Sequence, residues 1–143
     1  MTANVIDAVL AELRAFDEWP DGQAPDAFHF GEIPPLASKC EVGVMAGPQQ
    51  PLEMPAVSDT EEELVIQLSM AIDSANMEAS LRRALALRDT LRKIIWHATN
   101  WGLEDVTQTN LLGSTIGIGV DTRTNGWVLA ADVSFSVTYR DDF

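Results

Sequence analysis

Hydrophobic residues recur with the period of a helix in two parts of the chain. Between Thr2 and about Asp17, apolar side chains share one face at about 100° per residue, with Thr2 placed to cap the first turn. A second apolar arc runs from about Asn76 to Ala98, directly after Asp73, whose side chain can cap a helix. The sequence therefore predicts two amphipathic helices.

Other segments alternate apolar and polar residues, which is the period of a half-buried strand. They cover residues 38–46, 62–72, 114–121 and 127–140, with a shorter candidate at 103–109. The last segment has fourteen residues and would span about 46 Å, whereas the usual strand has about 5 to 6 residues. Asn125 and Gly126 before it predict a hairpin turn, and the terminal strand is long enough to extend beyond its own sheet and offer an open edge to a neighbour.

This order of elements favours an α+β fold. We expect a mainly antiparallel sheet of about four strands, with two helices packed on one face and a long terminal hairpin. Residues 1–143 suit a single domain in length. All seven prolines fall within residues 20–55, where we expect long loops around the strand at 38–46.

Acidic residues are concentrated in the first part of the chain. Residues 1–80 hold fifteen carboxylates and two basic residues, and the remainder holds seven of each. The resulting net charge of −13 argues against a protein that binds nucleic acid through its phosphates. Nothing resembles a signal peptide or a membrane span, so we expect a soluble protein without membrane partners.

Candidate catalytic and metal-binding residues are few. His29, His97 and Cys40 lack the spacing of metal ligands, and no nucleophile or phosphate-loop motif is present. The sequence predicts no enzymatic activity, no metal and no cofactor. The four carboxylates around the start of the strand at 62–72 favour a solvated loop over a cation site. They are Asp59, Glu61, Glu62 and Glu63.

Basic residues gather on the second helix, at Arg82, Arg83, Arg88, Arg92 and Lys93. Arg88 and Arg92 fall inside the apolar arc, whereas Arg82 and Lys93 point away from it. One interpretation is that their stems cover the edge of the core and reach acids of the same chain. The other is that a basic helix meets the acidic half of a neighbouring copy. Both stay open.

The tryptophans suggest anchors and one contact residue. Trp96 and Trp101 close the second helix and Trp127 opens the last strand, where large rings usually serve as core or hairpin anchors. Trp19, beside Pro20 in the proline-rich segment, is a better candidate for contact with a partner.

Together these segments resemble the tail terminator, or tail completion, proteins of long-tailed bacteriophages. The resemblance rests on the first helix, the strand EELVIQLSMAI, the helix MEASLRRALALRDTLRKIIW and the ending VLAADVSFSVTYRDDF. It covers the first helix and residues 60–143. The final strand ends in an aromatic residue and an arginine, Tyr139 and Arg140, as is common in that family.

The resemblance implies a structural role. Such proteins form a ring of about six copies that caps the tail tube, stops its growth and presents the surface that joins the head. Expected partners are further copies of the chain, the tail tube protein and head–tail connector proteins, in the virion and, during assembly, in the host cytoplasm. The interface candidates chosen from this sequence are Trp19, Arg82, Arg83, Arg88, Arg92, Lys93, Trp127, Ser134, Ser136, Thr138 and Arg140.

The acidic run has a hypothetical use in such a ring, because a negative lumen would repel passing DNA. Three alternatives remain at this stage. A head–tail connector or neck component has the same general properties. A small-ligand-binding α+β domain or enzyme would instead need a concave apolar cavity with convergent polar groups. An adaptor unrelated to phages would leave the long terminal strand unexplained.

Overall fold

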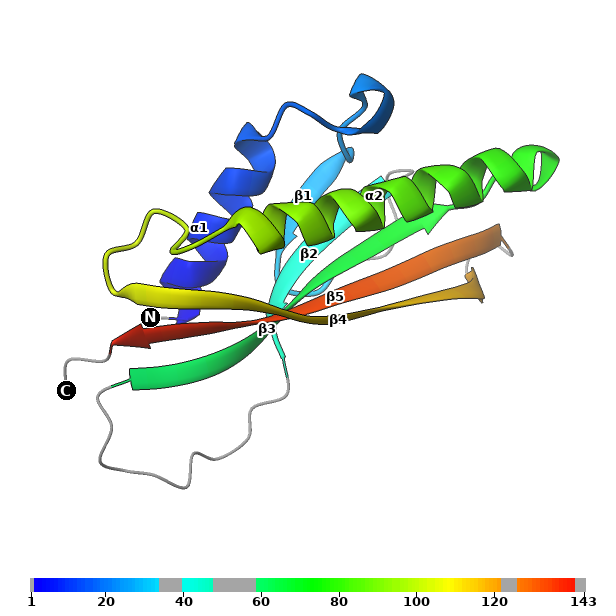
Figure 1. Ribbon diagram of the computed structural model, residues 1–143. Coiled ribbons are helices and arrows are strands. Elements are labelled where there is room, and N and C mark those ends of the chain that lie inside the picture. The colour runs from blue at the N-terminus through cyan, green and yellow to red at the C-terminus, as the bar shows by residue number, and fades with distance from the viewer. Residues whose placement is uncertain (1, 34–39, 48–58, 122–125, 141–143) are drawn as a thin grey trace.

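The computed structural model describes residues 2–33, 40–47, 59–121 and 126–140. These residues form two α-helices, two short 3-10 helices and one five-stranded sheet (Figure 1). In chain order the elements are α1 (Thr2–Ala15), η1 (Pro20–Gly22), β1 (Ala27–Phe30), β2 (Cys40–Ala46), β3 (Asp59–Ala71), η2 (Ser74–Asn76), α2 (Met77–His97), β4 (Val106–Asp121) and β5 (Gly126–Arg140).

Both predicted helices are present and bury their apolar faces. In α1 the buried residues include Val5, Val9 and Leu13, and in α2 they include Leu87 and Leu91. α1 packs on β1 and β2, while α2 lies across β3, β5 and β4. Each helix therefore covers a different part of the sheet.

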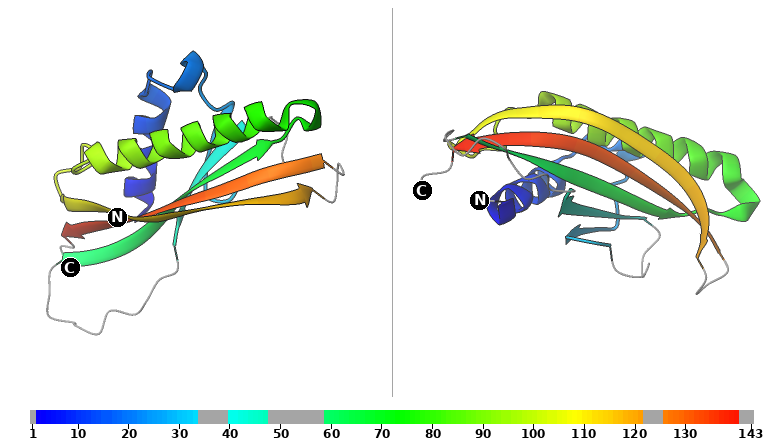
Figure 2. Two further views of the ribbon diagram at one scale, coloured as in Figure 1. Left: turned by 45° about the vertical axis from the view of Figure 1, so that its right-hand side comes forward. Right: turned by 90° about the horizontal axis from the view of Figure 1, so that it is seen from below.

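The strands follow the order β1-β2-β3-β5-β4. β1 runs parallel to β2, and every other neighbouring pair is antiparallel. β4 and β5 form the expected terminal hairpin and curve together along their length (Figure 2). The Asn-Gly turn predicted for this hairpin lies largely outside the described residues, as do five of the seven prolines.

Alternation along the strands separates two faces of the sheet. Ile66 and Leu68 on β3 are fully buried under the helices, as are Val133 and Phe135 on β5. Their neighbours in sequence, such as Ser134, lie on the other face. We call these the helix side and the outer face of the sheet. The α+β fold with two helices on one face is as predicted.

Two details of the sheet differ from the prediction. There are five strands, not about four, because residues 27–30 of the proline-rich segment form β1. Residues 106–109 of the segment predicted at 103–109 and the whole segment at 114–121 belong to one strand, β4. Register shifts occur between Val106 and Gln108 and between Leu111 and Gly113. At each shift the period-two alternation changes phase, so the sequence pattern predicted two separate strands where there is one.

Candidate functional site

The terminal strand β5 lies inside the sheet and not at its edge. It is hydrogen-bonded to β3 on one side and to β4 on the other. β3 has 13 residues and β4 has 16, so the two neighbours are long enough to pair with nearly all of β5. The prediction that β5 offers an open edge to a neighbour is therefore wrong.

β4 occupies the edge instead. It is last in the strand order, and within the described ranges no strand pairs with its second side. Its 16 residues extend for about 50 Å. A strand edge of this length presents a row of backbone N–H and C=O groups that can pair with another strand.

Exposed hydrophobic side chains follow the distal half of β4. Ile116, Ile118 and Val120 are 39%, 50% and 52% exposed. Their register with β5 places them on the helix side, where Leu129, the partner of Ile118, is fully buried. Helix α2 therefore covers β5 here but leaves β4 open. Together with Trp127, which is 46% exposed, these three residues form what we call the distal apolar row.

The outer face of the same half-strand is almost bare. Gly117 and Gly119 alternate with the distal apolar row, and a Cβ added to either would meet no atom within 4 Å. Thr115 beside them is exposed. Packing within the described chain therefore does not require glycine at either position, and the backbone is open to close approach by another strand.

One side of α2 faces β4 across a shallow hollow of about 420 Å³. Trp96 is 73% exposed there, and Arg92 and Lys93 are exposed beside it. The Nη1 of Arg92 lies 4.0 Å from the carboxylate of Asp89. The residues that line the hollow are Asp89, Arg92, Lys93, Trp96 and Leu111. This combination of cations and an open indole suits a partner that is both acidic and apolar.

The remaining predicted basic residues do not join this surface. Arg82 pairs with the glutamate one turn before it, at 3.0 Å, and both side chains are largely exposed, so the pair contributes little to stability. Arg83 donates a hydrogen bond from Nη1 to Gln23 beside η1. Arg88 donates to Asp89 at 3.3 Å, and its Nε is buried without a partner among the described residues.

The polar candidates on β5 lie on the outer face of the sheet. Ser134, Ser136 and Thr138 alternate with the buried core residues of the strand. Ser136 is only 3% exposed. Arg140 is exposed, and its backbone N–H donates to the carbonyl oxygen of Asp105 at 2.9 Å. These residues can meet a partner only through the outer face.

The predicted acidic loop is part of a strand. Glu62 points to the helix side, where Thr2 donates a hydrogen bond to its carboxylate at 2.6 Å and Tyr139 donates one at 3.3 Å. The Thr2 hydroxyl therefore joins the start of α1 to β3. Glu61 and Glu63 lie on the outer face, because they share the register of the β5 serine and threonine positions. The four carboxylates of the run are all residues of β3: Asp59, Glu61, Glu62 and Glu63.

The tryptophans also differ from expectation. Trp19 is 6% exposed and packs edge-on against Phe16, with ring centroids 5.0 Å apart, and beside Phe28 at 6.1 Å. Its ring fills the core and leaves little surface for a partner. Trp96 and Trp127, in contrast, are exposed. The exposed tryptophan surface is therefore near β4.

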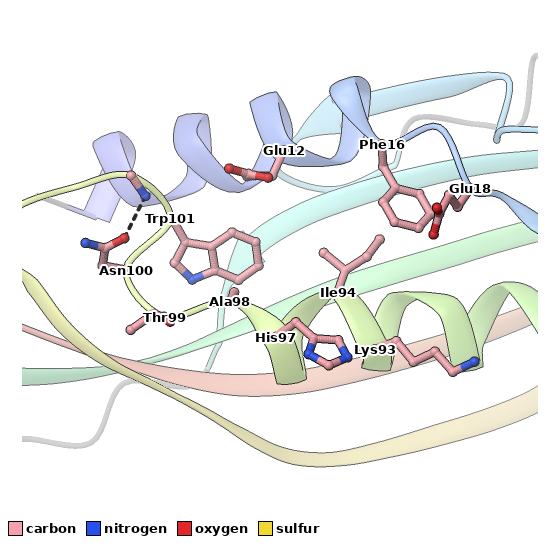
Figure 3. Close-up of a pocket in the computed structure, with 11 residues that line it drawn as sticks. Glu12, Phe16, Glu18, Lys93, Ile94, His97, Ala98, Thr99, Asn100 and Trp101 are labelled. Carbon is pink, nitrogen blue, oxygen red and sulfur yellow. Dashed lines mark hydrogen bonds between the residues drawn. The ribbon is translucent and has the colours of Figure 1, made fainter.

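A second hollow, of about 470 Å³, lies between the ends of α1 and α2 (Figure 3). Glu12 and Glu18 line it on the α1 side, and Lys93 and His97 line it on the α2 side. Trp101 is 6% exposed, and its indole N–H has no hydrogen-bond partner in the described parts of the chain. Among the described residues, no ion pair joins the two glutamate carboxylates to Lys93 or His97 across the hollow.

The two histidines do not join Cys40 in a site. His29 Nε2 lies 3.2 Å from the carboxylate of the buried Glu41, a pair that the sequence analysis missed. Burial raises the pKa of the Cys40 thiol from 9.0 to about 11, against the opposing effect of Arg83. Within the described ranges, no three His, Cys, Asp or Glu residues come together as metal ligands. Nor does any helix there have the length and apolarity to cross a bilayer.

Comparison by sequence gave no match, either to a protein-family model or to a curated protein. The fold is similar to that of a chain in the solved "virion of native gene transfer agent (GTA) particle". The TM-score is 0.66, and the match covers 96% of this chain and 95% of that chain. The sequence identity is 14%, so the likeness concerns the fold.

Proposed function

We propose that this chain is a structural protein of a phage-like virion and that it terminates the tail tube. Copies of the chain form a ring of about six subunits, close the end of the tube to further subunits and provide the surface for joining the head. The observation that carries this proposal is the likeness of fold, over nearly the whole chain, to a chain of a gene transfer agent virion.

The surfaces of the molecule suit assembly. A ring built head to tail needs two different surfaces that fit each other on successive copies. The sheet has two edges, β1 and β4, and the longer one carries exposed apolar side chains. Exposed apolar patches beside an open strand edge are typical of protein–protein contact.

The outer face of the sheet supplies a candidate lumen. Glu61, Glu63 and Asp132 lie on this face, and the helices lie on the other. If the ring turns its outer faces inward, DNA passes a surface whose carboxylates repel phosphate. Changing Glu61 and Glu63 to glutamine should slow the release of DNA from the assembled ring, which a DNA retention assay measures.

The proposal is tested with purified tail tubes and an elongation assay. Added protein should bind at one end of each tube in negative-stain images and stop further addition of tube subunits. A head–tail connector is the competing assignment within the same class, and it predicts binding to the portal or adaptor ring and unhindered tube growth. Absence of binding to tube ends together with normal elongation contradicts termination.

A further inference from the structure

We infer that the β4 edge of one copy pairs in antiparallel fashion with the β1 edge of a second copy, seating Phe30 of the second copy on the distal apolar row. This inference rests on the proposed ring and specifies which surfaces build it. It concerns the two ends of the strand order, because β1 and β4 each have only one strand partner in the described chain.

The exposed apolar residues of both edges lie on the same face of the sheet. Phe30 is 54% exposed, and its register partner Val44 is a fully buried core residue. Phe30 therefore projects on the helix side, as do Ile116, Ile118 and Val120 on β4. When two strand edges pair in a continuous sheet, side chains on the same face become direct neighbours. The pairing would cover Phe30 and the distal apolar row at once.

Strand direction agrees with this arrangement. β1 is parallel to β2, and each further step across the sheet reverses direction, so β4 runs opposite to β1. A rotation that carries one copy to the next without inverting the sheet then makes an antiparallel ladder. All helices stay on one side of the joined sheets. The contact is heterologous, and its repetition closes a ring when the rotation between successive copies divides a full turn.

The charges near the two edges are complementary. Asp26 and Glu32 flank β1 and are exposed, and the Asp26 carboxylate accepts a hydrogen bond from the backbone N–H of Cys40 on β2 at 2.9 Å. Arg14 also reaches this edge, where its Nη2 lies 3.4 Å from the carbonyl oxygen of Phe28. On the other side of the proposed contact, Arg92 and Lys93 are exposed beside β4. Opposite charges on the two edges favour β1 against β4 over contact between two like edges.

The glycines of β4 fit the same contact. His29 projects on the outer face of β1, because its register partner is Gly43 and the core-facing residues lie on either side of it. In the joined sheet it would lie beside Gly117 and Gly119, where the outer face has space for a side chain. The absence of side chains at these two positions permits close approach of the second strand.

Disulfide trapping tests the contact in the full chain. In a Cys40→Ser background, Phe30→Cys and Ile118→Cys place thiols on the same face of the two edges. Mild oxidation should give a ladder of dimers, trimers and larger multimers on a non-reducing gel. The matched control combines Phe30→Cys with Thr115→Cys, which is on the same edge but the outer face. The control should give no ladder above dimers.

Each outcome decides between the claims. A ladder from Phe30→Cys with Ile118→Cys, and not from the control, supports the β1–β4 contact. Rings seen by light scattering without that ladder overturn the contact and leave tube termination standing. A protein that stays monomeric, and also ignores tail tubes, overturns both. A ladder that appears only when tube protein is added means that the copies pair on the tube end, and it still supports the contact.

Discussion

β4 and β5 are neighbouring strands of almost equal length, yet their apolar side chains have opposite environments. On β5, Val133 and Phe135 are fully buried. On β4, Ile116 and Ile118 are 39% and 50% exposed although they lie on the same face of the sheet. The difference arises because β5 has strands on both sides, whereas β4 lies at the edge of the sheet and its distal half stays uncovered.

The position of an alternating strand in the sheet therefore decides whether its apolar side chains are buried. In the interior strand β5 the apolar side chains pack in the core, so their substitution should affect stability. In the distal half of the edge strand β4 the apolar side chains stay exposed, and we expect their substitution to affect assembly. The predictions below test this division, beginning with the largest effect.

Truncation of a core residue on β5 should destabilise the fold strongly. Phe135 is fully buried and packs 5.7 Å from the ring of Trp101, so Phe135→Ala should lower the free energy of unfolding by about 3 to 5 kcal/mol. Ile118→Ala on β4 is the control and should cost less than about 1 kcal/mol. Urea unfolding followed by tryptophan fluorescence measures both. Equal losses of unfolding free energy in the two variants would contradict the difference between the interior strand β5 and the edge strand β4.

Burial of Cys40 on the interior strand β2 also predicts that the stability of the fold depends on pH. The pKa of the Cys40 thiol is 9.0 in the ordinary case and about 11 in the fold. Below pH 9.0 the Cys40 thiol keeps its proton in both the folded and the unfolded chain. Between pH 9.0 and about 11 the thiol ionises in the unfolded chain but stays protonated in the folded chain. The free energy of unfolding should therefore fall by about 2 to 3 kcal/mol as pH rises through this window. Relative to Cys40→Ala, the wild type should show this extra loss; parallel pH profiles would refute it.

A charge on the distal apolar row should affect assembly and leave the fold intact. Ile118→Lys introduces a cation where the second copy would place Phe30, and we expect subunit association to weaken by at least about tenfold, equivalent to about 1.4 kcal/mol. The matched control, Thr115→Lys, puts the same charge on the outer face. Light scattering gives association, and thermal unfolding checks the fold. Similar association constants for the two variants would contradict the assignment of the helix side of β4 to the subunit contact.

The smallest effect is expected at a glycine of β4. Gly117→Ala adds a Cβ in open space and should stabilise the isolated subunit by about 0.5 to 1 kcal/mol, while weakening its association. Gly43→Ala in β2 is the counterpart, because there the Cβ would lie 2.6 Å from the carbonyl oxygen of Gly31. Thermal unfolding should show opposite signs for the two variants. Improved association of Gly117→Ala would contradict close approach of a neighbour.

Much of the fold was predictable because its periodic patterns are long. The apolar arcs of α1 and α2 and the alternation of β3 and β5 extend over many residues, so local errors do not obscure them. β1 has only four residues, too few to show a period. β4 was divided because its two register shifts change the phase of alternation.

The surfaces were less predictable than the elements. Alternation is the same in an edge strand and an interior strand, so the pattern alone could not show that Ile118 is exposed and Val133 is buried. Charge also misled at Glu62, which was assigned to a loop although hydrogen bonds from Thr2 and Tyr139 hold it on the helix side. In the sequence, the glycines at 117 and 119 were the feature that could have indicated that this part of the strand is exposed at a sheet edge.

The native mass of the protein tests the central claim most directly. Light scattering should be measured over a concentration range, alone and with short tail tubes, starting from the 15.6 kDa subunit. The proposed ring predicts a species of about six subunits, with negative-stain images of the same fractions showing closed rings. A subunit that stays monomeric at every concentration and also fails to bind tail tubes would contradict it.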